Sequence, residues 1–143
     1  MRNTIIIIVL SLLIFSCSKD NSASSPVLNF KSVNTTVLPV GQYVQFTLSF
    51  TDTNGDLDSV VVVKVVPLCP ADNFRDTLLL PTFPSSKKLT GDIVLTYGNN
   101  LLPLIGSPTC SDTDTCFFRF IALDASGHSS DSVQSPSIVV LSK

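Results

Sequence analysis

One stretch of the sequence, FTDTNGDLDSVVVV, carries oxygen-bearing side chains at alternate positions, namely Asp52, Asn54, Asp56 and Asp58. Carboxylate and amide oxygens suit a hard cation such as Ca²⁺, which takes roughly six to eight of them. The stretch is not an EF-hand, because Leu57 and Val63 stand where that loop needs Gly and a bidentate Glu. A solvated turn is the preferred interpretation, since Asn-Gly favours turns and Asp side chains bond nearby backbone N–H groups. Calcium is the alternative, and no other cofactor is expected.

The rest of the chain offers little chemistry. All 11 acidic residues are Asp, Trp is absent, and His128 is the one histidine. Near His128 lie three serines and two aspartates that imitate a hydrolase triad in composition, namely Ser126, Ser129, Ser130, Asp124 and Asp131, but no Gly-x-Ser-x-Gly turn is present. We therefore expect a non-enzymatic protein. The alternative is a small hydrolase or glycan-processing enzyme that uses Asp56, Asp124 and His128.

The composition predicts an all-β protein. The sequence has 16 Val against 4 Ala and 33 Ser plus Thr, so β-branched residues abound while strong helix formers are scarce. The hydrophobic fraction is 44% and the net charge is −2, which argues against a disordered chain and against a nucleic-acid partner.

The N-terminus predicts an exported protein. Arg2 precedes eleven largely apolar residues, 5–15, which suit a signal-peptide core and are too few for a membrane span of roughly 20. Ser16-Cys17 follows directly, and together with Ile14 it resembles the lipobox of bacterial lipoproteins. The resemblance implies a signal peptide over 1–16, a lipidated Cys17 and a Ser-rich flexible tether over 17–26. The alternative is an ordinary signal peptide cleaved near Ala23.

The residue after the lipidated cysteine bears on the destination. Ser18 stands there, and in many Gram-negative lipoproteins a residue other than Asp at this position directs the protein to the outer membrane. We expect a membrane attachment through Cys17, with the cell surface and the periplasmic face both open. An envelope protein or a glycan is the expected partner of the domain.

About seven short strands with turn signals between them predict a single immunoglobulin-like Greek-key β-sandwich over 27–143. The expected strands are 27–33, 43–50, 59–67, 76–81, 92–97, 116–124 and one within 132–141. The clearest is 43–50, in which apolar and polar residues alternate.

Two loops of this chain are similar to those of an immunoglobulin-like module found in lipoproteins of Gram-negative bacteria. Asp52, Asn54, Gly55 and Asp56 match its Asp-x-Asp-Gly-Asp-like loop, and the Asp124-Ala-Ser-Gly127 turn approximates its second motif. The resemblance implies the fold and marks no activity. In such a sandwich, loops 51–58 and 124–131 lie at one end, so that Asp124 can join the calcium candidates. A calcium-stabilised structural spacer is therefore a further functional alternative.

The three remaining cysteines, Cys69, Cys110 and Cys116, should cluster at the opposite end. We expect one disulfide and one free thiol in an oxidising envelope. The spacing leaves Cys110–Cys116 and Cys69–Cys110 both open. Zinc is not expected, because there is no Cys-x-x-Cys pair and His128 belongs to the far end.

The strand 59–67 is apolar on both faces. Val60 and Val62 share a face with Lys64, and we expect this face to point outward if Val61, Val63 and Val65 point into the core. The outward valines would then form a partner-binding patch or be covered by the apolar loop NNLLPLIG.

Overall fold

The structure is a computed structural model that describes residues 25–83 and 88–143. The predicted signal peptide 1–16, Cys17 and most of the tether 17–26 lie outside these ranges, so their predictions stand as predictions. Within the described ranges, no helix is long and apolar enough to cross a membrane.

The described part of the chain folds into two β-sheets and one short 3-10 helix, η2 (Pro70–Asp72). Its strands are β1 (Val27–Val33), β2 (Val37–Leu38), β3 (Tyr43–Asp52), β4 (Leu57–Val65), β5 (Phe74–Leu79), β6 (Leu89–Gly98), β7 (Thr113–Asp124), β8 (Val133–Gln134) and β9 (Ile138–Leu141). One sheet has the order β1-β3-β6, and the other has the order β2-β9-β7-β4-β5 with β8 paired to β7.

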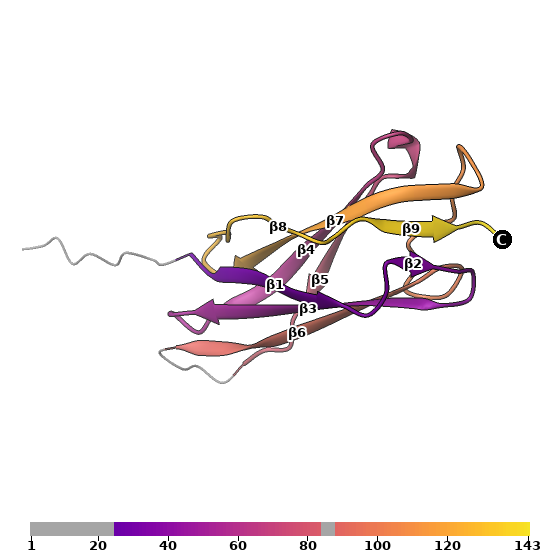
Figure 1. The fold of residues 1–143 in the computed structure, drawn as a ribbon. Helices are drawn as coiled ribbons and strands as arrows, with labels where there is room; N and C mark the ends of the chain where they lie inside the picture. Colours follow the sequence, from indigo (N-terminus) through magenta and orange to yellow (C-terminus); the bar gives the residue numbers. More distant parts are fainter. Residues whose placement is uncertain (1–24, 84–87) are drawn as a thin grey trace, which may run out of the picture.

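The two sheets form an immunoglobulin-like β-sandwich, as predicted (Figure 1). The third and sixth long strands in chain order, β4 and β7, pair antiparallel at the centre of one sheet, and β3 is central in the other. Strand β2 was not predicted from the sequence, and it pairs parallel with β9 over only two residues. The single last strand expected within 132–141 is two strands, because Pro136 has no N–H to continue the ladder.

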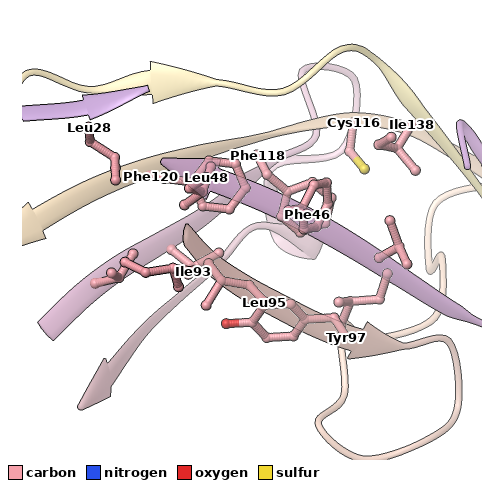
Figure 2. Close-up of a cluster of buried hydrophobic side chains, with 14 of the residues drawn as sticks. Leu28, Phe46, Leu48, Ile93, Leu95, Tyr97, Cys116, Phe118, Phe120 and Ile138 are labelled. Atoms are coloured by element: carbon pink, nitrogen blue, oxygen red, sulfur yellow. The ribbon is translucent and has the colours of Figure 1, made fainter. Parts of the chain in front are cut away.

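The core lies between the sheets and is rich in aromatic side chains (Figure 2). The alternating residues of β3 are all buried, as the pattern predicted, and Phe46 meets rings of β7 from the facing sheet. The centroid of Phe46 lies 4.7 Å from that of Phe118 and 5.2 Å from that of Phe120. These contacts fix the register of the two sheets and therefore the positions of the loops at both ends.

The predicted orientation of β4 is wrong. Val60, Val62 and Lys64 face the core and are fully buried, so the first two form no surface patch. Lys64 shares this inward face because a buried carboxylate, that of Asp114, accepts its hydrogen bond.

Candidate functional site

The two acidic loops meet at one end of the sandwich, as predicted. The backbone N–H of Ala125 donates to the carbonyl oxygen of Asp56 at 2.9 Å, and the hydroxyl of Ser126 donates to Asp56 Oδ2 at 2.8 Å. Leu57 also pairs with Asp124 in the β4–β7 ladder. The loop after β3 and the loop after β7 thus form one connected surface.

The most buried carboxylates at this end are occupied by backbone N–H groups. Asp52 accepts from the N–H of Asn54 at 3.2 Å and from that of Asp56 at 2.7 Å, through different oxygens. Asp124 accepts from the N–H of His128 at 2.7 Å, and its other oxygen lies 2.9 Å from His128 Nδ1. These bonds close the two turns, which is the role that the turn interpretation assigns to the Asp side chains.

The calcium candidates therefore differ in their surroundings. Asp58 is exposed on β4, and Asp56 Oδ1 is a buried oxygen with no hydrogen-bond partner. Among the described residues, the only group of three or more Cys, His or acidic side chains whose ligand atoms lie within 4.8 Å of one another is elsewhere, at Cys69, Asp72 and Cys110. The side chains of Asp52, Asp56, Asp58 and Asp124 do not converge to that degree.

The same loops hold the residues of the hydrolase alternative. His128 and Asp124 form an Asp–His pair, but the hydroxyl of Ser126 is directed to Asp56. A serine nucleophile must share its proton with the histidine. The pair therefore orders the turn, and Ser126 is not placed for attack. The hydroxyl of Ser130 is also directed elsewhere, to the carbonyl oxygen of Asp131.

The opposite end holds the cysteines. Cys69 and Cys110 form a disulfide with their Cα atoms 6.0 Å apart, and Cys116 is a buried free thiol. This resolves the two pairings that the spacing left open. Because both sulfurs of the group with Asp72 are in the disulfide, they are not thiolate ligands for a metal.

A depression of about 470 Å³ lies beside the disulfide, between η2 and residues 104–109. Asp72 joins its two sides, because it accepts hydrogen bonds from the backbone N–H and the hydroxyl of Thr109. These bonds hold the pKa of the Asp72 carboxyl below its usual value. The disulfide and the Asp72–Thr109 contact together brace the loops that border this depression.

Lys64 lies beneath the depression. Its Nζ donates to Asp114 Oδ2 at 3.2 Å, and the two side chains are 0% and 2% exposed. Neither residue was predicted from the sequence to belong to a site. The burial of Asp114 could have been predicted from the alternation of inward and outward residues in β7. Every second residue before Phe118, namely Cys116 and then Asp114, lies on the inward face.

Large apolar side chains are exposed around the same end. Leu68 lies next to Cys69 and is 92% exposed, and Leu102, in the loop after β6, is 83% exposed. Leu104 is also exposed and lines the depression. A buried site would hide such side chains, whereas a surface for a partner displays them.

The N-terminal strand of the sandwich begins at the other end, beside the acidic loops. Val27, the first residue of β1, pairs with Thr51, which directly precedes Asp52. Figure 1 places the start of β1 and the C-terminus at opposite ends of the sandwich. Residues 25–27 therefore adjoin the acidic loops, and the disulfide end lies farthest from them.

The fold thus defines a single immunoglobulin-like β-sandwich domain with two chemically different ends. No protein-family model and no curated protein matches this sequence. Among solved structures, the chain is similar to the sporulation control protein Spo0M of Bacillus subtilis, with 11% identity and a TM-score of 0.47. The similarity covers 84% of this chain and 51% of that one, so the chain spans about half the length of Spo0M.

Proposed function

We propose that the protein is a lipid-anchored lipoprotein of the outer membrane whose sandwich domain is a non-enzymatic binding module. The observation that carries the proposal is the arrangement of the two ends of the domain. Residues 25–27 enter beside the acidic loops, while the braced loops with exposed leucines lie at the far end. An anchor at Cys17 would hold the acidic end near the membrane and direct the disulfide end outward.

The exposed side chains favour a protein partner from the envelope over a glycan. Leu68, Leu102 and Leu104 offer apolar area, which protein interfaces bury at their centres. The sequence contains no Trp, the side chain that most often stacks against sugar rings. The disulfide limits the entropy that the loops would lose on binding, so it favours affinity.

Cross-linking and capture from envelope fractions test the proposal. We expect Leu68→Asp with Leu102→Asp to abolish capture of the partner, because two charges then lie at the centre of the interface. Leu79→Asp is the matched control, since Leu79 is also highly exposed but pairs with Ser59 near the acidic end. Equal capture by both variants would contradict a binding site at the disulfide end.

The anchor needs its own test. We expect Cys17→Ala to remove acylation and to release the protein from the outer-membrane fraction, and Cys116→Ala to leave both unchanged. Protease treatment of intact cells then reports the face of the membrane, because only a surface-exposed domain is digested. Acylation of the Cys17→Ala variant would overturn the anchor assignment.

A hydrolase remains the second candidate, and the Asp124–His128 pair is the observation that favours it. Alanine substitutions at Asp56, Asp124 and His128, with turnover and binding assayed separately, distinguish the two functions. For a binding module we expect no turnover in the wild-type protein and normal capture by His128→Ala. Turnover that His128→Ala abolishes would establish the enzyme.

A further inference from the structure

A lysine and an aspartate lie in hydrogen-bond contact inside the sandwich. Lys64 comes from β4 and Asp114 from the start of β7, which is its neighbour in the sheet. Their side chains are 0% and 2% exposed, and Nζ lies 3.2 Å from Oδ2. An amine and a carboxyl group held in this way are the two components of an amide bond.

Asp72 supplies a third group beside the pair. Asp72 and Lys64 both line the depression beside the disulfide. The bonds from Thr109 lower the pKa of Asp72, and the charge of Lys64 is a further cause that lowers it, so the Asp72 carboxylate is available to accept a proton.

We propose that the folded protein joins Lys64 to Asp114 through an amide bond. A proton first passes from the Lys64 ammonium to the Asp114 carboxylate. The lone pair of Nζ then attacks Cγ of Asp114, so that an Nζ–Cγ bond forms and the bond from Cγ to the hydroxyl oxygen breaks. Asp72 takes the proton released by the nitrogen and passes it to the departing hydroxyl, which leaves as water. One ammonium and one carboxylate become one amide and one water, and no oxidant, metal or cofactor takes part.

The surroundings favour this condensation in two ways. The fold holds the reacting groups together and excludes bulk water, which raises their effective concentration. Burial of two charges is costly even when they are paired, and the amide removes both charges. The bond would connect residues that are 50 positions apart in the sequence.

The chain contains a natural control. Lys31 and Asp92 form a pair of the same chemistry at 2.7 Å, but their side chains are 48% and 47% exposed. Water stabilises both ions there, so we expect no amide at this site. Because the residue types are identical, an amide at Lys64–Asp114 and none at Lys31–Asp92 would show the effect of burial.

Peptide mapping of the full-length protein tests the proposal. The protein is purified in detergent, denatured, reduced, alkylated and digested with trypsin. We expect no cleavage after Lys64, so that peptide 32–75 is linked to peptide 89–119 with a mass one water below their sum, while cleavage after Lys31 is complete. Complete cleavage after Lys64 together with an unmodified peptide 89–119 would overturn the proposal.

Variants test the assignment of the groups. We expect Lys64→Met with Asp114→Leu to abolish the linked species while its apolar side chains preserve the fold. We expect Asp72→Asn to slow formation roughly hundredfold, because it removes the proton carrier. Asp76→Asn is the control, since Asp76 is another half-buried carboxylate that accepts from Tyr97 at 3.2 Å. Formation of the Cys69–Cys110 disulfide verifies folding in each variant, and an unchanged rate in Asp72→Asn would refute the role of Asp72.

Discussion

Ser126 donates its hydroxyl proton to Asp56 across the two acidic loops, over 2.8 Å. The backbone N–H of Ala125 bonds the carbonyl oxygen of Asp56, so one residue receives both contacts. The acidic loop is thereby joined to the loop after β7 by hydrogen bonds within the protein. Asp56 acts first as a structural link between the loops, whatever else binds there.

Replacement of Asp56 should weaken this end of the sandwich. We expect Asp56→Ala to lower the free energy of unfolding by about 1 kcal/mol, because the half-buried Asp56 loses the exposed hydrogen bond from Ser126 that joins the two loops. Asp58→Ala is the control, and its effect should stay within about 0.5 kcal/mol because Asp58 is exposed. Urea unfolding of both variants measures the difference, and equal stabilities would contradict the structural role.

Calcium should leave the melting temperature unchanged. Asp52 and Asp124 already bond backbone N–H groups, and the acidic side chains of the two loops do not converge within 4.8 Å. The measurement is thermal unfolding with excess calcium and with EDTA. A melting temperature that rises with calcium in the wild type and not in Asp56→Ala would establish the calcium-stabilised spacer, with Asp56 Oδ1 as a ligand.

The thiol of Cys116 should be unreactive in the folded protein. Burial raises the pKa of Cys116 to about 11, so little thiolate forms at neutral pH even if a reagent reaches it. We expect alkylation only after unfolding, and mass spectrometry with a thiol reagent measures it. Rapid alkylation of the native protein at pH 7 would show that the β7 end opens.

The same thiol makes stability depend on pH in the alkaline range. The unfolded thiol has a pKa of 9.0 and the folded one about 11, so the folded state retains its proton at higher pH. This contribution is fully present below pH 9.0 and is lost as the pH rises toward about 11. We expect Cys116→Ala to lose less stability over this range than the wild type, as measured by urea unfolding at several pH values.

The disulfide should contribute more stability than any single loop contact. We expect Cys69→Ser with Cys110→Ser to lower the free energy of unfolding by about 2 to 4 kcal/mol, since the bond restricts the unfolded chain over a separation of 41 residues. Reduction of the wild-type protein should reproduce the loss. Cys116→Ala keeps the disulfide, so reduction should destabilise this variant to the same extent.

The fold could be predicted because its signals are local. The alternation of Phe46 with its neighbours in β3 identified a strand with one buried face, and turn residues separated the others. The meeting of Asp56 with Ser126 followed from the topology. The orientation of β4 could not be obtained in this way, because the partner that admits Lys64 to the core is Asp114, 50 residues away. Local patterns assign a lysine to solvent unless such a partner is known.

Asn99 should prove essential to the edge at which β2 and β9 run parallel. Its side chain is fully buried, and Nδ2 donates to the carbonyl oxygens of Leu38 at 3.1 Å and of Leu141 at 2.6 Å. This strand pair spans only two residues, so one amide group supplies much of its hydrogen bonding. We expect Asn99→Leu to cost about 2 to 4 kcal/mol, because the buried hydrogen bond to Leu38 and the partly buried one to Leu141 are both lost.

The control for Asn99 is Asn34→Leu. Asn34 also bridges two backbone groups, at Gln45 and Tyr43, but water can replace its bonds because they are exposed. Urea unfolding should therefore show a loss well below that of Asn99→Leu. Hydrogen exchange at Val139, whose N–H bonds Thr36 beside this edge, should also become faster in Asn99→Leu alone. Protected exchange at Val139 in that variant would mean that the edge is held by the packing of Leu38 and Val140.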